Sequence, residues 1–127
     1  MSLKHRWMAL ATLVASFAVS QANAVNVLAM SYDKATDQLV LKVAYRGTND
    51  QHSFTVHWEE CKDYAFVDAK YQVLGNLLDS QPDDQGTSEF TKDLRISLAT
   101  VECRPVKLTI RTTPGFFRTI VVPALAN

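Results

Sequence analysis

The sequence lacks an excess of charge of either sign. Its 127 residues include 13 Lys and Arg and 13 Asp and Glu. Proteins that bind nucleic acids or anionic membranes usually concentrate basic residues in a patch or stripe. No such stripe and no nucleic-acid-binding motif occurs here. We therefore expect neither polyanions nor anionic membranes as partners.

Long hydrophobic runs are also scarce. The longest apolar run covers residues 7–19, which is shorter than the roughly 20 residues of a membrane-spanning helix. A basic segment at 4–6 precedes it, and an A-x-A pattern at 22–24 follows. This layout is typical of a secretory signal peptide. It predicts a signal peptide over residues 1–24, a domain over 25–127 with no membrane span after cleavage, and a periplasmic or secreted location.

Cysteine is rare, with only Cys61 and Cys103 in the chain. An even number of cysteines in an exported protein predicts a disulfide. Such a bond would close a loop of 42 positions. A reduced thiol that binds metal or acts in catalysis is the alternative.

No convincing amphipathic helix pattern occurs after residue 24, whereas apolar and polar residues alternate with the period of a β-strand. Trp58 precedes both cysteines, so the Cys…Trp…Cys order of true immunoglobulin domains is absent. About seven short strands over about 100 residues predict an all-β fold, an antiparallel immunoglobulin-like β-sandwich with one disulfide, with a small barrel as the alternative. The expected strands are 25–31, 38–46, 52–58, 70–78, 93–98, 105–112 and 116–122.

Part of this pattern resembles a known group of proteins. Tyr45 leads into a turn with Gly47, then a His52-x-Phe54 strand follows, and Pro82-Asp83-Asp84 stand at 82–84 in a later loop. With these residues the chain resembles a group of uncharacterised exported bacterial β-sandwich domains. The resemblance covers about half of the mature chain. That family tends to carry a cysteine in the turn and another in the acidic loop, and this chain has neither. The resemblance implies a sandwich and brings no activity with it.

The segment HSFTVHWEEC at 52–61 combines types of side chain that bind zinc or copper. On a regular strand His52 faces the apolar side and His57 faces the other, so the two histidines cannot converge on one ion. His57 and Glu59 do share a face. A periplasmic metal-binding protein that uses His57 and Glu59, or His52, is therefore an alternative. The structural interpretation is a strand that ends in the disulfide, with His52 hydrogen-bonded to the turn at 49–50.

Catalytic signals are weak. No G-x-S-x-G nucleophile motif occurs. Glu59 and Glu60 would point to opposite faces of a strand, and Asp83 and Asp84 lie in a polar loop where we expect them to be solvated. We predict that the protein is not an enzyme and needs no cofactor, with a small secreted hydrolase or an inhibitor of a secreted enzyme as an alternative.

Adjacent aromatic residues suggest a contact surface. Phe116 and Phe117 cannot both face one core from a strand, so one of them should be exposed or should cover an open end of the sandwich. Tyr64 and Phe66 could extend an apolar patch, and the last strand could accept a partner strand at its edge. The sequence therefore favours an exported, non-enzymatic binding or accessory module of the bacterial cell envelope. Its partner would be an unidentified envelope or extracellular protein.

Overall fold

The protein folds into eight β-strands in two sheets. The structure is a computed structural model that describes residues 24–65, 67–113, 115 and 117–125. No helix occurs in these ranges, and so none that could cross a membrane. The strands are β1 (Val25–Asp33), β2 (Gln38–Gly47), β3 (Phe54–Trp58), β4 (Lys62–Asp63), β5 (Tyr71–Asp79), β6 (Ser88–Ser97), β7 (Val106–Arg111) and β8 (Phe117–Val122).

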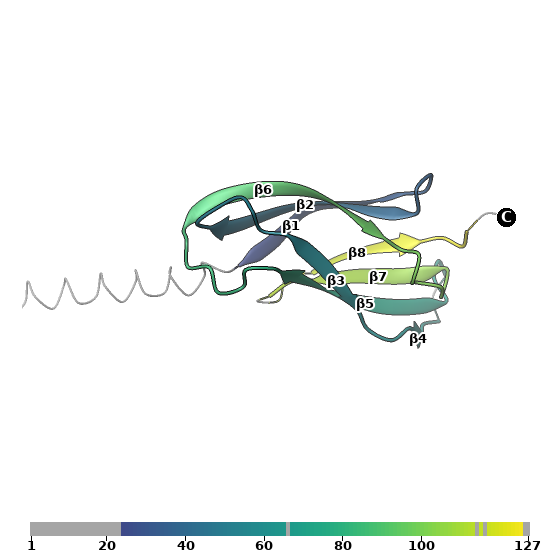
Figure 1. The fold of residues 1–127 in the computed structure, drawn as a ribbon. Coiled ribbons are helices and arrows are strands. Elements are labelled where there is room, and N and C mark those ends of the chain that lie inside the picture. The colour runs from purple at the N-terminus through teal and green to yellow at the C-terminus, as the bar shows by residue number, and fades with distance from the viewer. Residues whose placement is uncertain (1–23, 66, 114, 116, 126–127) are drawn as a thin grey trace, which may run out of the picture.

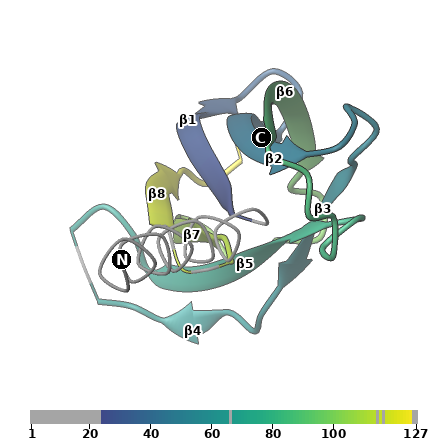
Figure 2. The same ribbon diagram turned by 90° about the vertical axis from the view of Figure 1, so that its left-hand side faces the viewer.

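The two sheets face each other as layers (Figures 1 and 2). Sheet A has the order β1-β2-β6, and sheet B has the order β3-β5-β7-β8 with β4 also paired to β5. An all-β fold with two sheets is thus confirmed. The prediction of an antiparallel fold is wrong in one pair, because β5 and β7 run parallel. β6 lies between β5 and β7 in the sequence and belongs to sheet A. The chain therefore returns to sheet B as β7, which runs in the same direction as β5.

The strand count also differs from the expected seven. The short β4 was not predicted, and β6 begins at Ser88 rather than at residue 93. Residues 88–92 pair with β2, and Phe90 is the partner of Tyr45. The two rings stack with their centroids 5.5 Å apart. This long-range contact extends the strand beyond the part with a clear apolar alternation.

The core lies between the sheets and is built by the alternating residues. In β2 the side chains of Leu39, Leu41, Val43 and Tyr45 are buried, because every second residue of a strand points to the same face. Burying a side chain of this size contributes roughly 1.5–3 kcal/mol relative to leaving it exposed. The other buried apolar residues of the core cluster are Val25, Val27, Phe54, Val73, Leu77, Leu98, Val101, Val106, Leu108, Ile110 and Val122.

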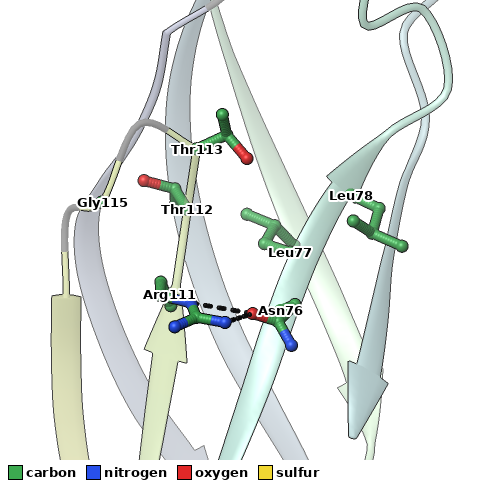
Figure 3. Close-up of a pocket in the computed structure, with 7 residues that line it drawn as sticks. All are labelled: Asn76, Leu77, Leu78, Arg111, Thr112, Thr113 and Gly115. Carbon is green, nitrogen blue, oxygen red and sulfur yellow. Dashed lines mark hydrogen bonds between the residues drawn. The ribbon is translucent and has the colours of Figure 1, made fainter.

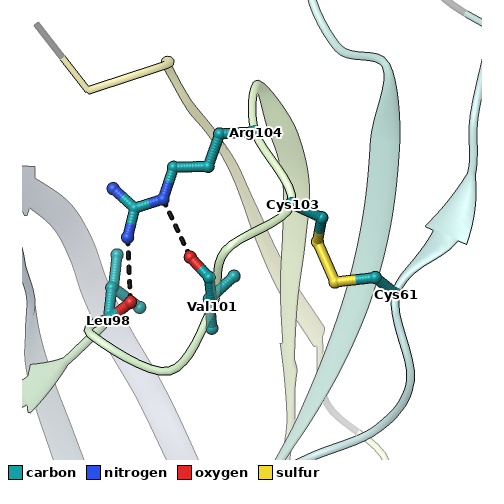
Figure 4. Close-up of a disulfide and its surroundings, with 5 residues drawn as sticks. All are labelled: Cys61, Leu98, Val101, Cys103 and Arg104. Atoms are coloured by element: carbon teal, nitrogen blue, oxygen red, sulfur yellow. Dashed lines mark hydrogen bonds between the residues drawn. A yellow bond between two sulfur atoms is a disulfide. The ribbon is translucent and has the colours of Figure 1, made fainter.

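One end of the sandwich is fixed by a disulfide and an arginine (Figure 4). Cys61 and Cys103 form the predicted bond, with their Cα atoms 6.5 Å apart. The next residue, Arg104, donates to Asp37 in the turn between β1 and β2, with Nη1–Oδ1 and Nη2–Oδ2 distances of 2.7 and 3.0 Å. Arg104 also donates to the carbonyls of Leu98 and Val101. The segment between β6 and β7 is therefore attached to both sheets.

Candidate binding face

A row of side chains crosses the outer face of sheet B. His57 pairs with Asn76, Asn76 with Arg111, and Arg111 with Phe117. Paired residues of neighbouring strands project from the same side of a sheet. These four residues therefore form one line across β3, β5, β7 and β8, which we call the cross-sheet row. His57 is exposed, and Phe117 is 60% exposed.

The polar members of the row hold one another in place. Arg111 donates to Asn76 Oδ1 from Nε at 2.9 Å and from Nη2 at 2.6 Å (Figure 3). Asn76 Nδ2 donates to Glu59 Oε2 at 2.9 Å, and Arg111 Nη2 lies 3.4 Å from the same oxygen. The backbone amide of Glu59 is bonded to the carbonyl of Leu74 in β5. These contacts fix the plane of the Arg111 guanidinium on an open surface.

A cavity opens beside this row where β5 and β7 separate. The ladder between the two strands ends at the pair Asn76 and Arg111, and the chains diverge beyond it (Figure 3). The space between them has a volume of about 410 Å³, within the range of about 300–1,000 Å³ typical of ligand pockets. We call it the β5–β7 slot. It is lined by Asn76, Leu77, Leu78, Arg111, Thr112, Thr113 and Gly115.

The two threonines of the slot differ in their surroundings. Thr112 is 3% exposed, and its hydroxyl has no hydrogen-bond partner within the described part of the chain. The hydroxyl of Thr113 points toward β5, whereas that of Thr112 points away from β5 (Figure 3). A buried hydroxyl without a partner carries a desolvation cost, and no contact with a described residue offsets it here.

Replacing Thr112 by Val should stabilise the protein. Valine has nearly the shape of threonine without the hydroxyl, so the change removes the unpaired polar atom and keeps the packing. We expect the free energy of unfolding to rise by about 1 kcal/mol, measured by urea denaturation. Thr109→Val is the matched control, because Thr109 Oγ1 has a partner in Thr119 Oγ1 at 3.0 Å. A lower stability for Thr112→Val than for the wild type would contradict the assignment of an unpaired hydroxyl.

A second polar cluster, the His52 centre, lies at the end of β5, where Asp79 is the last residue of the strand. His52 is 1% exposed, and the ring of Tyr45 lies against it at 4.7 Å between centroids. His52 Nδ1 lies 2.8 Å from the carboxylate of Asp79, and Nε2 lies 2.7 Å from Oδ2 of Asp84. A carboxylate only accepts hydrogen bonds. Both contacts are hydrogen bonds when both ring nitrogens carry a proton, so the two aspartates favour the imidazolium form of His52.

Asp84 is the anchor of this cluster. Its carboxylate accepts hydrogen bonds from the amides of Thr48 and Gly86, at 2.8 and 2.9 Å, and from the Thr48 hydroxyl at 3.1 Å. These backbone donors, together with His52, hold the pKa of Asp84 far below its ordinary value of 3.8. Burial alone would lower the pKa of His52, but the contacts with Asp84 and Asp79 outweigh it and keep that pKa above 6.5.

Two expectations about these residues are wrong. Asp84 is not solvated, because its side chain is only 6% exposed. His52 bonds Asp79 and Asp84 instead of the turn at 49–50. The loop after β5 folds back onto the turn after Gly47, and the partners lie 27 and 32 positions from His52. Local alternation contains no information about contacts of that range.

The metal candidates do not come together. His57 and Glu59 lie on the outer face of sheet B, whereas His52 lies in the interior. In the part of the chain that the structure describes, no group of three or more His, Cys, Asp or Glu side chains is arranged to hold a metal ion.

Of the four aromatic candidates, two can be located. Phe117 lies on the outer face of sheet B, and Tyr64 lies beside Lys107, whose Nζ is 3.3 Å from the Tyr64 hydroxyl and 5.0 Å from the ring centroid. Phe116 and Phe66 fall outside the described residues. Sequence reasoning missed Arg111 and Asn76 as site residues. The alternation in 105–112 predicted the face of Arg111, opposite to Leu108 and Ile110, but no face was predicted for Asn76, and the parallel pairing that joins the two residues leaves no signal in the sequence.

No protein-family model, no curated protein and no solved structure matches the chain. The function is therefore inferred from the surfaces of this molecule alone.

Proposed function

We propose that the protein is an exported, non-enzymatic binding or accessory module of the bacterial cell envelope. It acts in the periplasm or outside the cell and binds its partner with the outer face of sheet B. The observation that carries this proposal is Phe117, a phenylalanine 60% exposed at one end of the cross-sheet row. Aromatic and arginine side chains are enriched at the energetic centres of protein interfaces, and here Phe117 pairs with Arg111.

Two further features support export. The signal-peptide pattern at 1–24 precedes the first strand. The Cys61–Cys103 bond fits an oxidising compartment, where disulfides form and persist. An immunoglobulin-like sandwich belongs to the same proposal and is supported by the two facing sheets, although the parallel pair β5–β7 departs from that class.

The face of sheet B is a better binding surface than the edge of β8. β8 has one strand neighbour, β7, within the described residues. Its other side adjoins β1, where Arg118 Nε donates to the carbonyl of Val27 at 2.8 Å. An incoming strand would have to displace this contact. The side chain of Phe117 can be reached without any rearrangement.

Replacing Phe117 by Ser tests the proposal. We expect the variant to lose partner capture while its free energy of unfolding stays within about 0.5 kcal/mol of the wild type, as for most surface substitutions. Capture is measured by affinity purification from an envelope extract of the native host, with quantitative mass spectrometry.

Leu28→Ser is the matched control, because Leu28 is 44% exposed in β1 of the other sheet. It should retain every partner. The proposal fails if Phe117→Ser and Leu28→Ser retain the same proteins, or if Phe117→Ser melts far below the wild type, since the ring would then be part of the core.

A further inference from the structure

We propose that the β5–β7 slot binds the carboxylate at the C-terminus of an extended peptide, and that Arg111 recognises this carboxylate. The inference rests on the proposed binding function and names the chemistry of the partner.

The charge of the slot supports an anionic ligand. Among the described residues that line the slot, Arg111 alone is charged. Its close partner Asn76 is neutral. Glu59 does not line the slot, and it forms an ion pair with Nη2 of Arg111 at 3.4 Å. No described residue accepts a hydrogen bond from Nη1 of Arg111. The N–H groups of Nη1 therefore remain available to an oxygen of a carboxylate, in a charge-assisted hydrogen bond.

The guanidinium is also held in position before any ligand arrives. Two hydrogen bonds to Asn76 fix its plane, and Asn76 is fixed by Glu59. A ligand therefore loses little free energy in ordering the Arg111 side chain. The hydroxyl of Thr113, which points toward β5 (Figure 3), is a second donor on the same side of β7.

The shape of the slot suits an extended backbone. Beyond the last β5–β7 pair, residues 77–79 of β5 still pair with β3 on one side, but they have left the ladder with β7 on the other. A strand margin of this kind can bind a peptide through main-chain hydrogen bonds. Leu78, 48% exposed, provides an apolar surface beside it for a side chain of the peptide. A single positive charge next to apolar surface fits one carboxylate better than a phosphate dianion.

The test compares two peptides that differ only in the terminal group. The probes are N-acetyl-Gly-Ala-Val-Leu with a free carboxylate and the same peptide as its C-terminal amide. They are titrated into the disulfide-bonded protein in the millimolar range and followed by the NMR signals of Asn76 Nδ2 and Arg111 Nε. We expect the acid to bind at least about tenfold more tightly than the amide, a difference of about 1.4 kcal/mol.

Two variants, followed by the Asn76 Nδ2 signal alone, assign this preference to Arg111. Arg111→Gln should reduce the affinity for the acid to that for the amide, and Arg111→Lys should retain only part of the preference, because lysine keeps the charge but not the fork. Arg95→Gln is the matched control, since Arg95 is an exposed arginine of β6 in the other sheet, and it should bind like the wild type. Far-ultraviolet circular dichroism establishes that each variant is folded.

Three results would overturn the inference. Equal affinity for acid and amide, or no shift of the two signals with either peptide, would exclude recognition of a terminal carboxylate. Binding of N-acetyl-leucine as tight as that of the tetrapeptide would assign the slot to small carboxylates rather than to a peptide. Partner capture that requires Phe117 but survives Arg111→Gln would keep the proposed function and remove the slot from it. Acid-selective peptide binding by the slot, without capture of any partner by the protein, would support carboxylate recognition and contradict the proposed function.

Discussion

Removal of the disulfide by the double substitution Cys61→Ala and Cys103→Ala is expected to lower the free energy of unfolding by about 4 kcal/mol. The bond closes a loop of 42 positions, and without it the unfolded chain gains the conformational freedom that the loop removes. A single domain of this size has a total stability of roughly 5–15 kcal/mol. The variant should therefore unfold at a much lower urea concentration, with a steeper dependence on denaturant because the unfolded chain is more open.

Reduction and alkylation of the wild-type protein provides the control and should give the same unfolding midpoint as the double variant. The contrary result is a loss below about 1 kcal/mol. It would mean that the unfolded chain is already restricted, or that the contacts of Arg104 with Asp37, Leu98 and Val101 hold this end of the sandwich without the bond.

Replacing His52 by Ala is expected to cost about 3–5 kcal/mol, the usual loss when one partner of a buried ion pair is removed. Asp79 and Asp84 would keep their low exposure, 10% and 6% of the side chains, without the cation between them. The carbonyl of His52 also accepts a hydrogen bond from Lys92 in β6, so a shift of this segment would reach sheet A. His57→Ala is the matched control, because His57 is exposed five positions later. Equal effects of the two substitutions would refute the ion-pair assignment.

The same cluster sets a pH dependence whose direction follows from the two shifted pKa values. The pKa of His52 is raised above 6.5 in the folded state, so its stabilisation is complete below pH 6.5 and is lost as the pH rises through the folded-state value. The pKa of Asp84 is lowered below 3.8, so its stabilisation is present above pH 3.8 and is lost as the pH falls below it. In His52→Gln the alkaline loss should disappear, measured as urea midpoints across pH. A wild-type midpoint that stays constant on the alkaline side would contradict this.

Local patterns in the sequence predicted much of the fold. The alternation in β2, β3 and β7 gave their faces correctly, with Leu41 and Leu108 buried and His57 exposed, because the two-residue period of a strand is visible within a few positions. The disulfide followed from the even number of cysteines. The apolar pattern was less informative in β6, where inward-facing residues are only partly buried.

Contacts between distant segments could not be predicted in the same way. Gly47 and Gly86 meet backbone to backbone, and a Cβ on Gly86 would lie 2.1 Å from the carbonyl carbon of Gly47. The sequence contains both glycines without indicating that they touch. The His52 centre depends on this approach, since Asp84 lies beside both Gly86 and His52. The β5–β7 slot likewise depends on the parallel pairing of β5 and β7, which are separated in the sequence by β6 of the other sheet.

The parallel pair β5–β7 also restricts the order in which the chain can acquire structure. When the chain becomes available from the N-terminus onward, β2 can pair with β1 at once. The other edge of β2 stays unpaired until β6 is available. β5 likewise waits for β7 on one side. β2 and β5 therefore keep an unpaired edge until residues 88–111 are available to form β6 and β7. Unpaired strand edges favour aggregation with other chains. Folding of both sheets is therefore completed only when the C-terminal part of the domain is present, because β6 and β7 each close a strand that precedes them in the sequence.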